Sequence, residues 1–278
     1  MKFYVYKNSI ADIYIKSKSF FDDLYGFFYG FYVDKKQPRP YFKLFDYHCK
    51  EKNMIFVTGD THIPTDVRKL NSDRFPEQKE LTERDYLIIC GDFGGVFDNS
   101  NEEKYWLKWL SERNFTTLFV DGNHENHKML NEDFPVVDFC KGKAHKIRDK
   151  IYHLMRGEVF VIDDRKIFAF GGAASHDIGW RTENVNWWRA ELPTDEEMNT
   201  AIKNLSDNGW RVDAVITHCA SNSVQRLISP DFRNDILTDF FESIEGRLCY
   251  DRWFFGHYHI DRELDEKHTA LFEGILKL

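Results

Sequence analysis

Five short apolar runs of the sequence are each followed, within a few residues, by aspartate, asparagine or histidine. The segments that follow them are Gly59-Asp60-Thr61-His62, Gly91-Asp92, Gly122-Asn123-His124-Glu125, His218 and Gly256-His257-Tyr258-His259. Carboxylates, imidazoles and amide oxygens are ligands for borderline to hard divalent metals. In extended backbone, residues two apart point to the same side, so Asp60 and His62 can reach one ion. The residue types and their spacing therefore predict a metal site.

The number of candidate ligands exceeds what one zinc ion would use. The candidates are Asp60, His62, Asp92, Asn123, His218, His257 and His259. Zinc usually takes about four ligands, whereas this larger set suits two neighbouring ions that share a bridging carboxylate. Each segment alone is a weak signal. The ordered set, with every member at a predicted strand end, is what predicts a two-metal centre.

The apolar runs indicate buried β-strands that alternate with helices. The predicted strands are Ile55–Thr58, Tyr86–Cys90, Thr117–Val120, Val159–Ile162, Ile167–Phe170, Ala214–Thr217, Arg252–Phe255 and Leu271–Ile275. Apolar residues at helical spacing predict helices over Glu102–Arg113 and Thr194–Asp207, the second with a capping box of Thr194 and Glu197. Such alternation is typical of an α/β (α+β) fold, in which sites form at the carboxyl ends of strands.

Composition and charge exclude several classes of protein. A net charge of −8 makes long duplex nucleic acid an improbable partner, because affinity for its phosphates is built from Lys and Arg. The five cysteines are scattered without a C-x-x-C pair, which argues against a disulfide framework or a zinc ribbon. No apolar run reaches the roughly 18 residues of a membrane span, and no signal peptide is recognisable. A cytoplasmic protein without a membrane partner is expected.

The first 53 residues differ from the rest of the sequence. Aromatic residues crowd the stretch from Ser19 to Tyr32, and Pro38-Arg39-Pro40 indicates an extended linker before the first predicted strand. We therefore expect an N-terminal aromatic-rich extension over residues 1–53 and a catalytic domain over residues 54–278. The extension has no residues that suggest chemistry. Packing or oligomerisation is its expected role.

The ordered segments resemble the calcineurin-like metallophosphoesterase superfamily. The sequence between them is similar to that of small bacterial and phage metallophosphoesterases. Those similar stretches are Leu87–Gly95, His153–Gly157 and Gly171–Asp177. The resemblance implies two mixed β-sheets packed as a sandwich and flanked by helices. It also implies two divalent metal ions, Mn²⁺ before Fe, Zn or Ni. The reaction implied is hydrolysis of a phosphate ester by a hydroxide that bridges the ions.

The same resemblance assigns a role to each matching residue. Asp60, His62 and His259 would bind the first ion, Asp92 would bridge both, and Asn123, His218 and His257 would bind the second. His124 would be the catalytic acid or a phosphate contact, and Asp92 would share in catalysis through the bridged ions. Asp121 and Glu125, which flank this motif, could orient His124 or the ligands.

Two positions depart from the family pattern. Protein phosphatases of the superfamily carry Asp-Arg where this sequence has Gly95 and Val96, so the arginine that would grip a phosphomonoester is missing there. Ile63 follows His62 where glycine is usual. A Ser/Thr-type protein phosphatase is thereby disfavoured but stays an alternative. A noncatalytic binding module on the same fold is a second alternative, although it would be expected to have lost ligands or His124.

The expected substrate is a small phosphorylated or nucleotide-like molecule, either a phosphodiester or a phosphomonoester. Loops on a rigid scaffold often carry specificity, and three residues of the less regular part of the chain could contact such a substrate. They are Arg156, His176 and Arg181. Either arginine could replace the missing phosphate contact, and His176 could line the site from another strand end.

Overall fold

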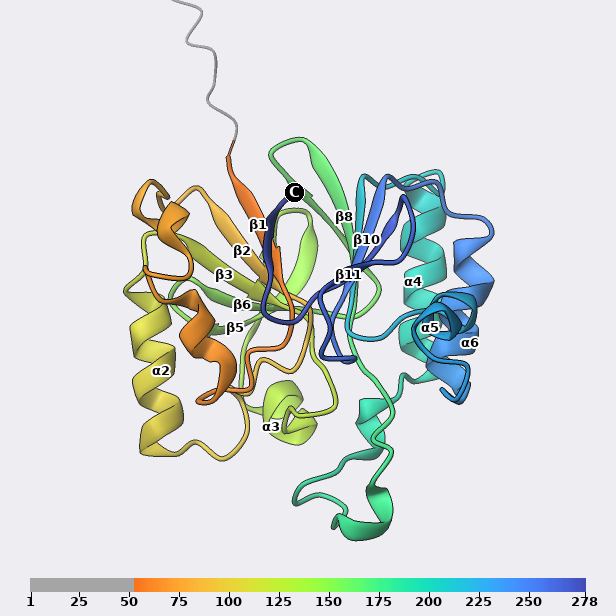
Figure 1. Cartoon of the computed structure of the whole chain (residues 1–278), viewed down its shortest axis with the longest axis horizontal. Helices are drawn as coiled ribbons and strands as arrows, with labels where there is room; N and C mark the ends of the chain where they lie inside the picture. The colour runs from red at the N-terminus through yellow and green to blue at the C-terminus, as the bar shows by residue number, and fades with distance from the viewer. Residues whose placement is uncertain (1–52) are drawn as a thin grey trace, which may run out of the picture. The chain divides into compact units, whose positions relative to one another are not determined.

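Two mixed β-sheets form the centre of the protein (Figure 1). The computed structural model describes residues 53–278. The expected N-terminal extension, residues 1–53, lies outside this range apart from Asn53. Its proposed packing or oligomerisation role therefore stays a prediction.

The first sheet has the strand order β13-β1-β2-β3-β6-β5-β4. Its strands are β1 (Ile55–Thr58), β2 (Tyr86–Ile89), β3 (Thr116–Phe119), β4 (Val136–Phe139), β5 (Gly142–Arg148), β6 (Ile151–Leu154) and β13 (Ile275–Lys277). The four strands β1, β2, β3 and β6 run parallel to one another, and the edge strands are antiparallel to them or to each other. The parallel strands therefore end at one common edge of the sheet.

The second sheet repeats this arrangement with the order β11-β12-β10-β9-β8-β7. Its strands are β7 (Glu158–Ile162), β8 (Arg165–Phe170), β9 (Ala214–Thr217), β10 (Arg252–Phe255), β11 (Arg262–Glu263) and β12 (His268–Ala270). Strands β8, β9, β10 and β12 are parallel, and β7 and β11 pair antiparallel at the two edges.

Helices cover the outer face of each sheet (Figure 1). The helices are α2 (Asn101–Ser111), α3 (His127–Glu132), α4 (Asp195–Asp207), α5 (Asn222–Ile228) and α6 (Ile236–Glu245), with 3-10 turns η1 (Asp66–Leu70), η2 (Pro76–Lys79), η3 (Ile178–Trp180) and η4 (Arg189–Glu191). Helix α2 packs with η1 against the first sheet, and α4, α5 and α6 pack against the second. The predicted architecture of two mixed sheets flanked by helices is confirmed.

The core between the two sheets explains why the central strands are apolar on both faces. Val57, Ile88 and Leu118 of the first sheet meet Phe160 and Ile216 of the second in one cluster, and all five are fully buried. The opposite faces of these strands lie under the helices, so no strand face is left for polar residues. Burial of each such side chain contributes roughly 1.5–3 kcal/mol. This packing gives the strand ends a rigid support.

The predicted strands agree with the structure except at the C-terminal end. Ile55–Thr58, Ala214–Thr217 and Arg252–Phe255 have the predicted bounds. The predicted strand Leu271–Ile275 is wrong, because β12 ends at Ala270 and β13 begins only at Ile275. The amides of Phe272, Glu273 and Gly274 donate to the carboxylate of Asp261 and so are not free to pair in a sheet.

Local capping fixes where the two predicted helices begin. Thr194 and Glu197 form the predicted capping box of α4, and Ser100 accepts a hydrogen bond from the amide of Glu103 to cap α2. Each cap satisfies amides that the first helical turn leaves unpaired. None of the helices described for residues 53–278 is long and apolar enough to cross a membrane.

Candidate metal centre

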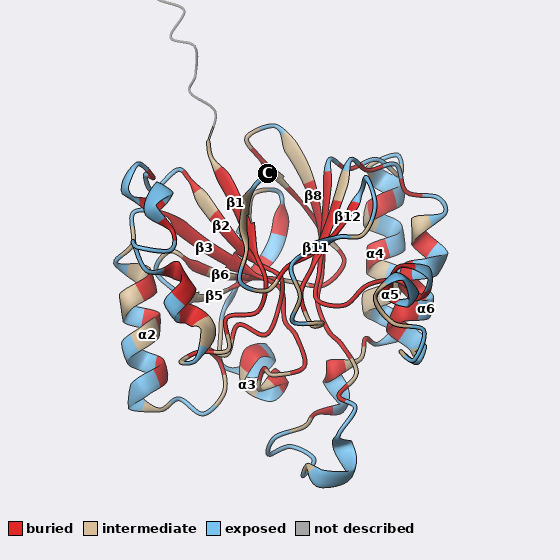
Figure 2. Cartoon of the chain, in the orientation of Figure 1, coloured by how far each residue is buried: buried red, intermediate tan, exposed pale blue. Residues whose placement is uncertain are grey.

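The candidate ligands come together where the carboxyl ends of β1, β2, β3, β9 and β10 meet, at the lower centre of Figure 1. The connecting segments there are largely buried (Figure 2). Asp60 and His218 are fully buried, and Asp92 and Asn123 are nearly so. Polar groups this deep require partners, and they find them in one another.

One group of ligands consists of Asp60, His62 and His259. Their ligand atoms lie within 4.8 Å of one another, and Nε2 of His259 is 3.2 Å from Oδ2 of Asp60. The rings of His62 and His259 meet edge to face with centroids 5.0 Å apart. This is the set that the family resemblance assigned to a first ion.

The second group surrounds His218. Its Nε2 lies 3.3 Å from Oδ1 of Asp92 and 3.3 Å from Oδ1 of Asn123, and its ring centroid is 5.0 Å from that of His257. Asp92 also reaches the first group, because its other oxygen is 3.2 Å from Nε2 of His62. The two carboxylate oxygens of Asp92 thus face histidines of different groups.

Two glycines permit this close convergence. A Cβ atom on Gly122 would lie 2.1 Å from Oδ1 of Asp92. A Cβ atom on Gly256 would lie 2.0 Å from Oδ1 of Asp60. Any side chain at either position would collide with a ligand carboxylate, so the backbone can pass there only as glycine.

The buried carboxylates draw positive charge into the site. Burial acts to lower the pKa of His218, but Asp92 and Asp60 outweigh it and raise that pKa to about 10. The same competition, mainly with Asp92, raises the pKa of His62 to about 9. Burial would raise the pKa of Asp92, yet the charges and hydrogen bonds of His218 and His62 hold it well below its usual range. The donors therefore form a site that favours cations.

The orientation of two histidines also fits metal binding. Nδ1 of His62 is 2.8 Å from Oδ2 of Asp66, and Nδ1 of His218 is 2.8 Å from the carbonyl oxygen of Cys90. These contacts leave Nε2 of each ring facing the carboxylates. A metal-ligating histidine usually has its other nitrogen held in this way. With carboxylates, imidazoles and one amide oxygen converging, the residues present fit two divalent ions.

The sequence model of the calcineurin-like phosphoesterase family matches residues 54–261. The chain belongs to this family. The resemblance drawn from the sequence motifs is thereby confirmed, and metal-dependent phosphoester hydrolysis is the general activity of the family. Among curated proteins, no relative matches the chain.

His124 lies at the mouth of the phosphoesterase site. Its ring centroid is 5.3 Å from that of His62, and its backbone amide donates to Oδ1 of Asp92 over 2.9 Å. Burial lowers the pKa of His124, and the charges of His62 and Arg181 act in the same direction. A ligand atom of its ring also lies within 4.8 Å of ligand atoms of His62 and Asp92. The position is compatible with proton donation or with metal contact.

In the structure Arg156, which the sequence offered as a phosphate contact, pairs with Asp121. Nε of Arg156 donates to Oδ2 of Asp121 over 3.0 Å, and Nη2 donates to the carbonyl oxygen of Ala190 over 2.8 Å. Oδ1 of Asp121 is also 3.0 Å from Nε2 of His153. Asp121 opens the segment that carries Asn123 and His124, so this buried network holds that segment in place.

Replacing this arginine should destabilise the protein strongly. Arg156→Met is expected to lower the free energy of unfolding by about 3–5 kcal/mol, because it leaves Asp121 buried without its charge partner. The measurement is urea unfolding at neutral pH. Arg189→Met is the matched control, since Arg189 pairs with Glu183 at 2.6 Å but is 79% exposed. The free energy of unfolding of this control should stay close to that of wild type. Equal stability of the two variants, with a raised KM for Arg156→Met, would restore a substrate role.

The other two expected substrate residues lie near the site. The His176 ring is exposed, with its centroid 6.0 Å from that of His257. Nε of Arg181 pairs with Oδ1 of Asp177 at 2.6 Å, and its charge acts on His124. Both come from the segment after β8 that projects below the sheets in Figure 1.

Sequence reasoning left the role of Glu125 open and did not mention Asp66 or Lys69. The carboxylate of Glu125 is fully buried and accepts hydrogen bonds from the amides of Gly94 and Gly122. It thereby links the loops after β2 and β3. Asp66 stands four residues after His62 in η1 and orients its ring, which the spacing could have suggested. Nothing in the sequence pattern distinguishes Lys69.

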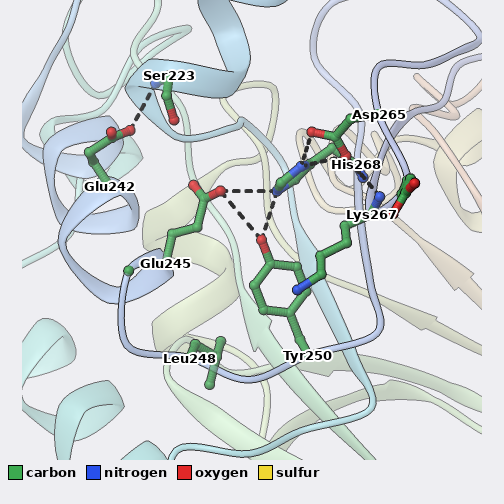
Figure 3. A pocket seen from close by; sticks show the side chains of 10 residues that line it. Ser223, Glu242, Glu245, Leu248, Tyr250, Asp265, Lys267 and His268 are labelled. Carbon is green, nitrogen blue, oxygen red and sulfur yellow. Dashed lines mark hydrogen bonds and ion pairs between the residues drawn. The ribbon is translucent and has the colours of Figure 1, made fainter.

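A separate cavity of about 610 Å³ lies away from the phosphoesterase site, between α6 and β12 (Figure 3). His268 is a buried ionisable group that lines it. Nδ1 of His268 is 2.8 Å from Oδ2 of Asp265, and its Nε2 is 3.3 Å from Oε1 of Glu245. The hydroxyl of Tyr250 is 2.9 Å from the same Nε2. His268, Asp265 and Glu245 thus form an ion triad, although Oε2 of Glu245 is buried without a hydrogen-bond partner within residues 53–278.

This triad should make stability depend on pH. Burial acts to lower the pKa of His268, but Glu245 and Asp265 raise it above its usual value. The stabilisation is therefore complete below about pH 6.5, the pKa of an unfolded histidine, and is lost as pH rises through the folded pKa. We expect His268→Gln to unfold at lower urea concentration than wild type at pH 6. The difference should shrink as the pH rises through the folded pKa of His268. A difference that grows with pH would contradict the triad. Hydrolytic activity serves as the control and should not change.

Proposed function

We propose that the protein hydrolyses a phosphate ester with the help of two divalent metal ions. The observation that carries the proposal is the placement of Asp92, whose two oxygens face His62 and His218 at 3.2 Å and 3.3 Å. A carboxylate in this position suits a bridge between the two ligand groups. When bound, the ions would supply Lewis acidity at the phosphoryl oxygens and a water nucleophile of lowered pKa.

The protein's own residues would position the ester and manage the proton. Asp60, His62 and His259 would hold one ion, and Asn123, His218 and His257 the other, with Asp92 between them. His124 would donate a proton to the leaving oxygen, since its backbone amide is fixed on Asp92 at 2.9 Å and its ring stands at the mouth of the site. Arg181 and His176 would contact the substrate from the loop after β8.

The two alternative functions, a protein phosphatase and a noncatalytic binding module, receive less support. The positions where protein phosphatases carry Asp-Arg are filled by Gly95, which packs against Phe93, and by Val96, which is fully buried under α2. A side chain at position 96 would face the core, away from a substrate. A noncatalytic binding module would not need the complete ligand set and His124 that converge here.

A small phosphorylated or nucleotide-like molecule is the substrate we propose. The net charge of −8 supports this against long duplex nucleic acid. We also propose a cytoplasmic setting, which the free thiols of Cys90, Cys140, Cys219 and Cys249 support. Manganese is the proposed metal, with iron, zinc and nickel as the alternatives.

The test is hydrolysis of para-nitrophenyl phosphate and bis(para-nitrophenyl) phosphate by the full chain loaded with Mn²⁺. We expect turnover of at least one ester, loss of turnover with a chelator, and about two bound ions per chain. The ratio of the two rates decides between monoesterase and diesterase. Protein that binds no stoichiometric metal and cleaves neither ester would refute the proposal.

A further inference from the structure

His259 differs from His62 and His218 in how its ring is held. His62 and His218 each have the second ring nitrogen fixed by an oxygen atom at 2.8 Å. Across residues 53–278, the second nitrogen of His259 makes no such hydrogen bond, and the side chain is 52% exposed. Among the described residues, the polar contact of its ring is with Asp60. A ring held by a single contact can turn away from an ion, so something else must fix its orientation.

The ring of Phe272 lies flat against that of His259. Their centroids are 4.5 Å apart and their planes differ by 9°, which is close to parallel stacking. Such an aromatic pair restricts rotation of the histidine ring and covers one of its faces. Phe272 belongs to the bend between β12 and β13, at the place where the sequence had indicated a strand.

That bend is fastened to the strand ends by its backbone. The carboxylate of Asp261 accepts the amide hydrogens of Phe272, Glu273 and Gly274 at 2.8, 3.1 and 2.9 Å. The hydroxyl of Thr58, at the end of β1, donates to the carbonyl oxygen of Gly274 over 2.8 Å. Phe272 is therefore presented to His259 on a fixed support.

Lys69 connects this support to the first ligand loop. Its side chain is only 1% exposed, and Nζ donates to the carbonyl oxygens of Gly59, Asp60 and Phe272. All three ammonium donors are thus used on backbone oxygens. A Cβ atom on Gly59 would lie 2.0 Å from the carbonyl oxygen of Leu271, so the two segments are in direct contact. One buried cation thereby ties the loop that carries Asp60 to the bend that carries Phe272.

We propose that Phe272 is a positioning residue for the first metal ion, acting through His259, and that Lys69 and Asp261 hold it there. The inference rests on the two-metal function proposed above. The family match ends at residue 261, before this bend. Phe272 is not itself a candidate ligand, whereas His259 is one. Its effect should therefore appear in metal affinity before it appears in the chemical step.

The experiment is a stepwise calorimetric titration of the metal-free full chain with Mn²⁺ alone. Phe272→Leu should bind one of the two ions about tenfold more weakly and the other as wild type does. Phe272→Tyr keeps the stacked ring and should restore wild-type binding. With Mn²⁺ saturating, kcat of Phe272→Leu should stay within about twofold of wild type.

A matched control comes from the far edge of the first sheet. Phe139 stacks on Tyr152 with the same centroid separation of 4.5 Å and is likewise half-buried. Phe139→Leu should leave the affinity for both ions unchanged. Asp261→Ala removes the support but keeps the Phe272 ring, and it should weaken the same ion. Asp261 and Phe272 are not in the core, so both variants should fold.

Three outcomes would overturn the positioning role. They are unchanged binding of both ions by Phe272→Leu, equal weakening of both ions, or failure of Phe272→Tyr to restore affinity. Failure of the proposed function is a separate result, because it would appear in the wild-type chain as absent metal binding and absent hydrolysis. That result would remove the metal centre and this inference with it.

Discussion

Asp92→Asn should reduce kcat/KM for phosphate-ester hydrolysis about 10³-fold without unfolding the protein. Asp92 is 2% exposed, and each of its oxygens contacts a histidine of a different ligand group. Asparagine has the same shape and can still accept the hydrogen bond from the amide of His124. What the substitution removes is the negative charge shared between the two groups.

The expected loss of kcat/KM follows from how much the charge of Asp92 contributes to catalysis through the metal ions. A loss of ~4 kcal/mol of metal-dependent stabilisation corresponds to about three factors of ten, at about 1.36 kcal/mol for each. The variant should also bind less than the full complement of Mn²⁺. Metal content by mass spectrometry and kcat/KM at saturating Mn²⁺ are the measurements.

The control for this substitution is Asp98→Asn. Asp98 is exposed and its carboxylate accepts a hydrogen bond from the amide of Ser100 at the start of α2. The same chemical change there should leave kcat/KM within about twofold of wild type. Retention of more than a tenth of wild-type activity by Asp92→Asn would show that Asp92 does not bridge two ions.

The sequence predicted the central strands well because their physical signal is strong. β1, β9 and β10 are largely buried, so most of their residues are apolar, and a polar ligand follows each within two residues. The ligands were predictable for the same reason. β4 and β5 were missed because they contain lysine, aspartate and arginine and are partly exposed. Strands with exposed polar residues carry little of the apolar signal.

The sequence does not show which residues far apart in the chain contact one another. Arg156 looked free to contact phosphate, but its partner Asp121 is 35 positions away in the chain. Lys69 binds the backbone of Phe272 across 203 positions. Pairings of this kind depend on the packing of the two sheets, which no local pattern encodes. The wrong strand at Leu271–Ile275 has the same origin, because Asp261 captures the amides that a strand would have used.

The second large effect concerns the proton on the leaving group. His124→Ala should slow hydrolysis of an alkyl phosphate ester by about 10²–10⁴-fold, the usual contribution of a positioned acid. The para-nitrophenyl ester should be slowed much less, because para-nitrophenolate is a stable anion and leaves without a proton. The measurement is kcat for both esters at saturating Mn²⁺, in wild type and in the variant.

The ratio of the two losses separates acid catalysis from metal binding. The ring of His124 has a ligand atom within 4.8 Å of ligand atoms of His62 and Asp92, so the geometry alone permits either role. If His124 is the acid, the Mn²⁺ content stays at the wild-type level, and only kcat for the alkyl ester falls by the full expected factor. His62→Ala is the control, since it should lose metal and slow both esters equally. If His124→Ala behaves as His62→Ala does, His124 is a ligand and the proton must come from another group, such as His176, whose ring centroid lies 6.0 Å from that of His257.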